Sequence, residues 1–487
     1  MMIFAYMAAG AILLLLAVMI IRAVLFKPSA AAAEQPDDIR VDTEAASKHL
    51  SDLVQFKTIS RPNPDDVDWR EFDRLQKYLD DNYPLIRKSL KKEVIAGHSL
   101  LFCWKGKNPG REALALLSHM DVVPVMPGTE ADWEHDAFSG DNDGEFIWGR
   151  GTLDMKGHLV SVMESVEGLL RQGFEPECDI YLCFGHNEEV VGSSGGGAKA
   201  IAETLKARGV KIGCVLDEGG AIVPGAMVGI GGRLATIGIA EKGYADIRIT
   251  AAHIGGHSSQ PPRNSGLVQI ADAVVKLEKR QFMKRMTTTV SQMFGIVGRY
   301  MSFGKRLLFA NMWLAKPLVL SIFTKMPATN AMIRTTTAPT MTEGSPAANV
   351  LPQTGNVTVN FRVLQGEKIQ DVFDHIRQVT GNSNLKLELL RGKEPSAVSP
   401  TDSREYAVLS KSIRQIFGAI PVAPYLMVGG TDSCFYEILT ASIYCISPFE
   451  FELEDLKRIH GTNEKIKIGS LEKGIKLITQ FILNYCR

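Results

Sequence analysis

Three short apolar segments, each followed by acidic or histidine residues, constrain the fold of this chain most strongly. The segments are residues 113–117, 179–184 and 214–216. The polar residues that follow them are His119, Glu188, Glu189 and Asp217. Helix-like stretches at 159–172 and 196–208 lie between the segments, and this alternation predicts an α/β fold. Sites in open α/β sheets form at the carboxyl ends of strands, which is where these polar residues fall.

The chain of 487 residues is long enough for two domains. We expect a catalytic domain, with a mixed sheet flanked by helices, in two parts at residues 42–232 and 396–487. Residues 233–395 are predicted to form an inserted α+β lid or dimerisation domain. The reason is a change of pattern: the strand candidates 245–251 and 356–363 adjoin the helix candidates 266–280 and 369–380.

The N-terminus differs from the rest of the chain. Residues 1–21 form an uncharged apolar run, followed by Arg22 and Lys27. Its length suits a bilayer-spanning helix, so we predict a single-pass membrane anchor over residues 1–27 and a tether over residues 28–41. A cleaved signal peptide is the alternative. The two basic residues favour a cytoplasmic location for the part that follows, and the side of the membrane is left open.

Charge and cysteine content exclude two classes of protein. Lys+Arg and Asp+Glu both number 54, and no basic patch stands out, which argues against a nucleic-acid partner. The seven cysteines are scattered without a Cys-x-x-Cys motif, so neither a disulfide framework nor a zinc-thiolate site is expected. Buried free thiols are predicted instead.

Residues 293–323 are unusually apolar and bulky. A buried lid helix or helix pair is the favoured interpretation. The alternative is a surface for an apolar substrate or for a membrane.

Five residues supply the side chains that a pair of zinc ions needs. Two closely spaced zinc ions require a bridging carboxylate and about two further nitrogen or oxygen ligands each. The candidates are His119, Asp154, Glu189, Asp217 and His460. Any one of them alone would ordinarily be a surface acid or a core histidine. Together, at strand ends and without cysteine, they favour hydrolytic zinc chemistry.

Two neighbouring residues, Glu188 and Asp121, complete this constellation. Glu188 and Glu189 point in opposite directions if their segment is extended, so one can bind metal while the other acts as general base. Asp121 follows His119 by two residues and could hydrogen-bond its imidazole. Asp154 lies in a glycine-rich turn that can aim its carboxylate.

The motifs resemble those of a known family. They are His119-Met-Asp121-Val-Val-Pro, Trp148-Gly-Arg-Gly-Thr-Leu-Asp154-Met-Lys-Gly, His186-Asn-Glu188-Glu189, Asp217-Glu-Gly, Gly256-His257-Ser-Ser and Arg458-Ile-His460-Gly-Thr-Asn-Glu464. From about residue 45 to the C-terminus the chain resembles the dinuclear-zinc aminoacylase/carboxypeptidase metallopeptidases. Within this family the chain most resembles the carboxypeptidase S branch, which residues 329–338 support, and the secreted N-fatty-acyl-amino-acid synthase/hydrolases.

The resemblance implies roles for the metal-binding residues. His119 and Asp217 would hold one zinc ion. Glu189 and His460 would hold the other, with Asp154 as the bridge between them. Glu188 would be the general base, and Asp121 the acid that orients His119.

The resemblance also implies roles for the inserted domain. In the family this domain is a lid and often a dimerisation surface, so a homodimer is expected. His257 would polarise the substrate carbonyl, often in the active site of the partner subunit; a plain turn residue is the alternative. Asn349 and Arg362 would bind the substrate carboxylate, although Arg362 could also be a solvated strand-end charge. Gly429 and Gly430 could add backbone N–H groups.

The expected function is that of a two-zinc hydrolase acting on an amide bond next to a free carboxylate. An N-acyl amino acid with an apolar acyl chain is the first substrate candidate, with hydrolysis or synthesis as the direction. A peptide with a free C-terminus, cleaved by a carboxypeptidase or dipeptidase, is the alternative. A membrane-tethered binding protein without catalysis would have lost Glu188 or a ligand, and all are present.

Overall fold

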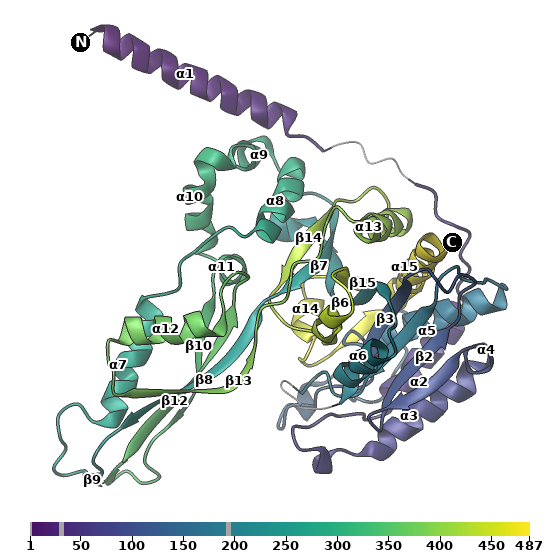
Figure 1. Cartoon of the computed structure of the whole chain (residues 1–487), viewed down its shortest axis with the longest axis horizontal. Coiled ribbons are helices and arrows are strands. Elements are labelled where there is room, and N and C mark those ends of the chain that lie inside the picture. Colours follow the sequence, from purple (N-terminus) through teal and green to yellow (C-terminus); the bar gives the residue numbers. More distant parts are fainter. Residues whose placement is uncertain (1, 29–33, 191–195) are drawn as a thin grey trace.

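A large mixed sheet, a smaller antiparallel sheet and one projecting helix make up the molecule (Figure 1). The computed structural model describes residues 2–28, 34–190 and 196–487. Residues 29–33 of the predicted tether lie outside this described part. The projecting helix is α1 (Met2–Leu25), and the two sheets lie side by side below it in Figure 1.

The large sheet has eight strands in the order β1-β2-β5-β3-β6-β15-β7-β14. The strands are β1 (Lys91–Ile95), β2 (Ser99–Trp104), β3 (Ala113–His119), β5 (Ile180–Gly185), β6 (Ile212–Pro224), β7 (Arg233–Glu241), β14 (Val422–Met427) and β15 (Ile443–Glu450). Its centre is parallel, since β5, β3, β6 and β15 run in one direction, whereas β1–β2, β2–β5 and β6–β7 pair antiparallel. The predicted fold class, a mixed sheet with flanking helices, is confirmed.

Helices cover both faces of the large sheet because its strands are apolar on both sides. They are α2 (Thr43–Val54), α3 (Trp69–Asn82), α4 (Pro84–Ser89), α5 (Lys156–Arg171), α6 (Gly197–Ala207), α13 (Arg404–Phe417) and α15 (Ile468–Cys486). The core with α2, α5 and α15 fills one face, and a smaller core with α6 fills the other. Local capping fixes the start of α2, where the carboxylate of Asp42 accepts a hydrogen bond from the N–H of Ala45 at 3.0 Å.

The small sheet has four antiparallel strands in the order β10-β12-β8-β13. Its strands and covering helices are β8 (Gly243–Ala252), α7 (Gly266–Lys279), β10 (Thr336–Glu343), β12 (Thr354–Val363), α12 (Ile369–Thr380) and β13 (Leu385–Lys393). Burial alternates along β8 and β12, and the buried face packs on the two helices. The predicted insertion begins at residue 233, but residues 233–241 form β7 in the large sheet, so the small sheet starts at Gly243.

Four helices connect α7 to β10: α8 (Thr288–Tyr300), α9 (Phe303–Ala310), α10 (Met312–Phe323) and α11 (Pro327–Ile333). The buried residues of α8 and α10, such as Phe294 and Val319, belong to the same core as the large sheet. Figure 1 shows α8 beside β14, the edge strand of that sheet. The predicted burial of residues 293–323 is therefore confirmed for one face of these helices, whereas Trp313, Leu314 and Leu318 are exposed.

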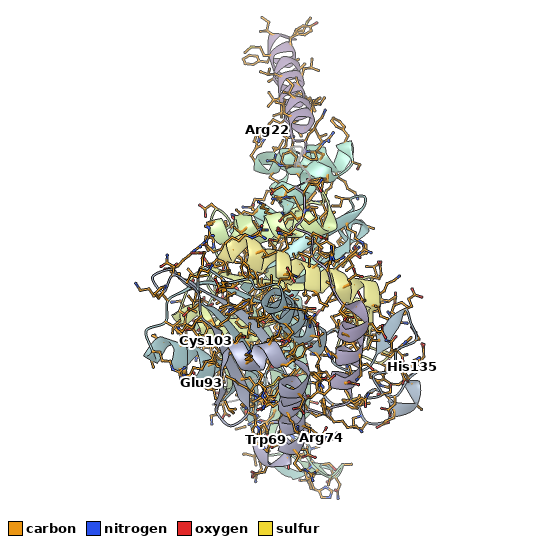
Figure 2. The ribbon with its side chains drawn as sticks, turned by 90° about the vertical axis from the view of Figure 1, so that its right-hand side faces the viewer. Arg22, Trp69, Arg74, Glu93, Cys103 and His135 are labelled. Atoms are coloured by element: carbon orange, nitrogen blue, oxygen red, sulfur yellow. The ribbon has the colours of Figure 1, made fainter. Side chains whose placement is uncertain are left out.

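Helix α1 is, within the described residues, the single helix long and apolar enough to cross a membrane, and the bent pair of α9 and α10 also passes when it is counted as one span. Only the last turns of α1 touch the rest of the protein. The guanidinium of Arg22 donates to the carbonyl of Ala310 at 3.1 Å, and the amide of Asn311 donates to the carbonyl of Met19 at 3.0 Å. Figure 2 shows Arg22 at the base of the projecting helix.

The remaining short elements are β4 (Phe146–Trp148), β9 (Gly256–His257), β11 (Val350–Leu351), α14 (Asp455–Arg458) and β16 (Lys465–Lys467). All seven cysteines are free thiols; six are buried and Cys434 is half-buried, which confirms the prediction of buried thiols.

Candidate active site

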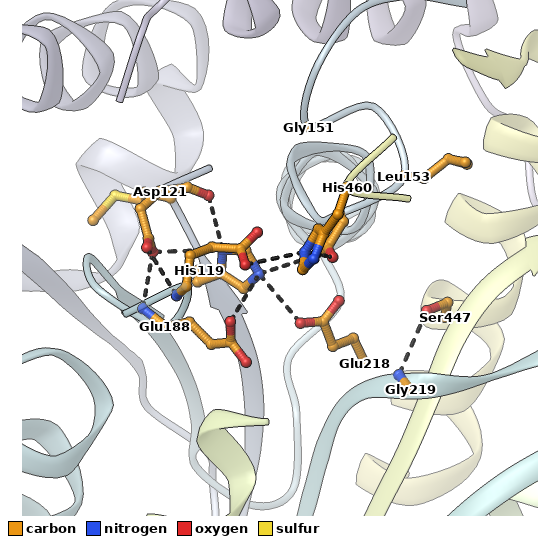
Figure 3. A network of polar contacts seen from close by, with 12 residues as sticks. His119, Asp121, Gly151, Leu153, Glu188, Glu218, Gly219, Ser447 and His460 are labelled. Carbon is orange, nitrogen blue, oxygen red and sulfur yellow. Dashed lines mark hydrogen bonds and ion pairs between the residues drawn. The ribbon is translucent and has the colours of Figure 1, made fainter. Parts of the chain in front are cut away.

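Adjacent strand ends of the large sheet gather the acidic and histidine residues (Figure 3). His119 is the last residue of β3, and Glu188 and Glu189 follow β5, its parallel neighbour. Asp154 comes from the turn before α5, and His460 from the loop between α14 and β16. The strands are parallel, so their ends bring together side chains that are far apart in the sequence.

Asp154 lies between the two histidines. Its Oδ1 is 3.1 Å from Nε2 of His119, and its Oδ2 is 3.0 Å from Nε2 of His460. The same nitrogen of His460 is 3.1 Å from Oε2 of Glu189. Burial opposes the charge of Asp154, but the hydrogen bonds from His119 and His460 lower its pKa. The hydrogen bonds to Asp154 and Glu189 raise the pKa of His460 to about 10.

The turn that presents Asp154 is organised by Glu464, a residue without a predicted role. Its buried Oε1 accepts hydrogen bonds from the backbone N–H groups of Gly151, at 3.0 Å, and Leu153, at 2.9 Å. Its Oε2 pairs with the guanidinium of Arg150 at 2.6 Å. The peptide bond that follows Asp154 is cis. Glu464 lies four residues after His460, so one loop supplies both the histidine and the support for the opposing turn.

Asp121 holds the backbone of the two glutamates. Its two carboxylate oxygens accept hydrogen bonds from the N–H groups of Glu188 and Glu189, both at 3.1 Å. Nδ1 of His119 is nearer to the backbone oxygen of Asp121, at 2.9 Å, than to its carboxylate, at 3.5 Å. The expected contact with the imidazole is present mainly through the backbone, and the carboxylate also positions the segment after β5.

Glu218, rather than Asp217, faces His119. Its Oε1 lies 3.2 Å from Nε2 of His119, and Figure 3 shows its side chain pointing toward the imidazole. Both residues lie within β6, where consecutive side chains point to opposite faces. Oδ2 of Asp217 is buried without a hydrogen-bond partner among the described residues. The structure thus brings Glu218, rather than the expected Asp217, next to His119.

The cluster carries more negative charge than its histidines balance. Burial, followed by the charges of neighbouring carboxylates, raises the pKa of Glu188 and of Glu218 well above the ordinary value. Burial and the charge of Asp217 raise the pKa of Asp432 to about 8. Burial lowers the pKa of His119, but the charge of Glu218 and hydrogen bonds to Asp121 and Asp154 outweigh it, and the pKa is raised. A divalent cation would relieve this repulsion.

The donor atoms fit divalent metal ions. Two groups of atoms, His119–Glu188–Glu218 and His119–Asp154–Glu189, each lie within 4.8 Å of one another. Oε1 of Glu189 is buried without a hydrogen-bond partner among the described residues. A buried carboxylate oxygen without a partner is expected where the oxygen binds a metal ion. Imidazole and carboxylate together suit zinc better than magnesium or calcium, which prefer oxygen ligands.

A second buried acid, Glu241, holds the loop that contains Gly429 and Gly430. Its Oε1 accepts hydrogen bonds from the N–H of Thr431 at 3.0 Å and from its hydroxyl at 2.8 Å. Its Oε2 forms an ion pair with Lys393 at 2.8 Å. Glu241 ends β7 and Lys393 ends β13, so the loop is anchored where the two sheets join. In the sequence, the charged pair Glu241-Lys242 interrupts an apolar run, and this interruption could have indicated that Glu241 has a structural role.

His257 and Asn349 lie away from this cluster. His257 pairs with Val350 in the β9–β11 ribbon, and the N–H of Ser258 donates to the carbonyl of Asn349 at 3.1 Å. Figure 1 shows β9 at the tip of the small sheet that is farthest from the large sheet. Arg362 lies at the other end of β12, where its guanidinium is 4.8 Å from the ring of Tyr244. Within a single chain, His257 and Asn349 therefore do not lie beside the cluster around Asp154.

Comparison with known proteins identifies the class. Residues 115–484 match the sequence profile of peptidase family M20/M25/M40, and the chain belongs to this family. It is a metal-dependent hydrolase.

Two relatives and one solved structure are similar over most of the chain. Carboxypeptidase S-like protein 2 of Dictyostelium discoideum is 36% identical over 448 residues, which are 91% of this chain and 85% of that protein. The N-fatty-acyl-amino acid synthase/hydrolase PM20D1 of Xenopus tropicalis is 35% identical over 455 residues, 91% of this chain and 87% of that protein. An M20 family metallo-carboxypeptidase from Sulfolobus solfataricus has the same fold, with a TM-score of 0.64 and 17% identity over 90% of this chain and 98% of that one.

Proposed function

We propose that this protein is a two-zinc amidohydrolase that cleaves an amide bond next to a free carboxylate, with N-acyl amino acids as its substrates. The observation that carries the proposal is Asp154, whose two oxygens each meet a different histidine. Each histidine also contacts a different glutamate: His119 contacts Glu218, and His460 contacts Glu189. Two sets of ligands that share one carboxylate are what a dinuclear site requires.

The two sets would hold one zinc ion each. His119 and Glu218 would bind the first, His460 and Glu189 the second, and Asp154 would bridge them. When bound, the ions would supply Lewis-acid chemistry that polarises the amide carbonyl and makes the attacking water more acidic. Asp217, which was expected from the sequence as a ligand, would lie behind Glu218.

Glu188 would move the proton. Its Oε2 lies 4.0 Å from Nε2 of His119, at the edge of the proposed metal site. It would take a proton from water while the water oxygen bonds to the carbonyl carbon, and would pass it to the nitrogen as the C–N bond breaks. Asp121 would keep Glu188 in place through the backbone N–H.

The small sheet would supply the remaining polar groups in a homodimer. His257 and Asn349 lie together at its far tip, so they would serve the active site of a partner subunit, where His257 stabilises the developing oxyanion. Arg362 and the Gly429–Gly430 loop, next to the joint between the sheets, would bind the substrate carboxylate.

A substrate panel tests the proposal. The zinc-loaded full chain is incubated with N-acyl amino acids and with dipeptides that have a free C-terminus, and kcat/KM is measured for each. N-acyl amino acids with apolar chains should rank first. Glu188→Gln with its metal retained is the matched control. Absence of hydrolysis of both classes would overturn the proposal.

A peptide substrate is the second candidate, and the similarity to carboxypeptidase S-like protein 2 favours it. Dipeptides would then rank first in the same panel, with the same residues performing the same steps.

The protein would be anchored in a membrane by α1. The helix has 24 residues, about 36 Å at 1.5 Å per residue, which exceeds the roughly 30 Å of a hydrocarbon core. Alkaline extraction of membranes that contain the full chain, with N-terminal sequencing, separates a retained anchor from a cleaved signal peptide. Release of the intact chain would contradict the anchor.

A further inference from the structure

Residues 279–342 have an unusual charge distribution for a chain with no net charge. This stretch contains ten basic residues and no aspartate or glutamate. The basic residues are Lys279, Arg280, Lys284, Arg285, Arg299, Lys305, Arg306, Lys316, Lys325 and Arg334. Within the described part of the chain, only Arg285 among them forms a salt bridge with a carboxylate. The positive charge of this segment is therefore largely unneutralised by the protein.

The same segment exposes large apolar side chains. Helices α9 and α10 meet at an angle of 114°, and α10 buries only one of its faces. The other face carries Trp313, Leu314, Leu318 and Ile322, continued by Met326, and Trp313 is 59% exposed. Lys316 and Lys325 are exposed among these residues. An exposed helix face with tryptophan, leucine and lysine is typical of helices that lie in the interfacial layer of a bilayer.

The position of α1 places this face at the level of a membrane. Ala23 in α1 is buried, and Met19 and Arg22 hydrogen-bond to Asn311 and Ala310, which lie where α9 ends and α10 begins. About 20 helical residues are needed to cross the hydrocarbon core. Counted from Met2, they extend to the turn of α1 that touches α9. An inserted α1 therefore brings the bilayer surface down to α9 and α10, and Figures 1 and 2 both show these helices at the base of α1.

We propose that α9 and α10 form a platform that lies on the bilayer surface and binds anionic phospholipid, so that the protein contacts the membrane through this surface as well as through α1. The inference rests on the proposed anchor for its geometry. The acid-free charge and the exposed apolar face support it independently. Apolar side chains would enter the acyl boundary while lysines meet the headgroups.

Tryptophan fluorescence of the full chain in vesicles tests the platform. The chain is reconstituted in phosphatidylcholine vesicles with or without phosphatidylserine, and emission is compared between ordinary and bromine-labelled lipid. Bromine should quench part of the emission, and Trp313→Phe should lose that part. Trp69→Phe is the matched control, because Figure 2 shows Trp69 at the end of the molecule opposite α1; it should keep the quenched part. Phosphatidylserine should increase the quenching, and Lys316→Gln/Lys325→Gln should remove that increase.

Three other outcomes distinguish the platform from the anchor and from a dimer contact. A chain that resists alkaline extraction but whose Trp313 is unquenched overturns the platform and leaves the anchor standing. Release of the chain by alkali would contradict the membrane anchor. If Trp313 is nevertheless quenched in the same vesicles before extraction, the result supports the platform without the anchor. If Trp313 is unquenched and the chain forms a dimer that the substitution Trp313→Asp dissociates, the exposed face binds a second copy of the chain. This result would overturn the proposal.

Discussion

The carboxylate of Glu218 lies 3.2 Å from Nε2 of His119, although its neighbour Asp217 follows the apolar run of the strand. β6 continues through both residues to Pro224, so the two side chains leave the strand on opposite sides. Of these two adjacent acids, Glu218 is the one that contacts the histidine.

This arrangement predicts different outcomes for two amide substitutions. Glu218→Gln should lose about one zinc ion per subunit and lower kcat/KM at least about 100-fold, because it removes a proposed ligand. Asp217→Asn should keep both ions, since its carboxylate lies behind the site. Metal analysis of the purified variants distinguishes them. Loss of zinc from Asp217→Asn but not from Glu218→Gln would restore the assignment expected from the sequence.

Removing the proposed base should separate chemistry from metal binding. Glu188→Gln should lower kcat by about 100- to 10,000-fold while the zinc content is unchanged, because a positioned base contributes an effect of that size. Single-turnover kinetics with metal analysis of the same sample measures both. Unchanged turnover would contradict the role of Glu188.

Subunit mixing tests whether His257 acts in the partner's active site. Glu188→Gln and His257→Ala should each be nearly inactive alone. After dissociation and reassociation of an equal mixture, half of the dimers are mixed, and each mixed dimer holds one intact site. About one quarter of wild-type activity should return. No recovery, from a mixture shown to exchange subunits, would place His257 outside the partner's site.

The ion pair between Glu241 and Lys393 should control substrate affinity. Lys393→Met leaves Glu241 buried without its cation and loosens the loop from Gly429 to Thr431, so KM should rise about 10-fold with a smaller change in kcat. The free energy of unfolding should fall by about 2 kcal/mol. Lys393→Arg, which keeps the charge, should restore KM. A fall in kcat at constant KM would argue against this positioning role.

Lys242 predicts a pH dependence of stability. Its ammonium group donates to the carbonyls of Ala331 and Arg334 at 2.9 and 2.8 Å, and burial lowers its pKa from 10.5 to about 7. Between these values the unfolded chain retains a proton that the folded chain has released, so this group's contribution to stability increases as the pH rises. The slope is at most about 1.4 kcal/mol per pH unit.

Thermal unfolding of wild type and Lys242→Met at about pH 7 and pH 10 measures this contribution. The Tm of wild type should rise relative to that of the variant at the higher pH. A Tm difference that does not change with pH would show that Lys242 keeps an ordinary pKa.

The sequence predicted what short-range patterns determine. The strands before His119 and Glu188, and helices such as α5 and α12, follow from apolar periodicity, and they lie within a few residues of their expected bounds. The contact of Glu218, rather than Asp217, with His119 could not be predicted, because the strand was expected to end at residue 216 and in fact continues. Glu464 and Glu241 form hydrogen bonds and ion pairs with residues that are distant in the sequence, and no local sequence pattern indicates such contacts. The proposed role of His257 depends on a second subunit, which the sequence of a single chain does not reveal.

The packing of α8 on β14 attaches the helices that follow α8 to the large sheet. The buried side of α8 belongs to the core of the large sheet, so α9 and α10 are fixed to the half that carries His119 and Asp154. Rotation about the joint near Lys242 would therefore carry only the small sheet and its tip. If α9 and α10 lie on a bilayer as proposed, that part would move through water, and the viscosity of the lipid would not slow the approach of His257 to a neighbouring site.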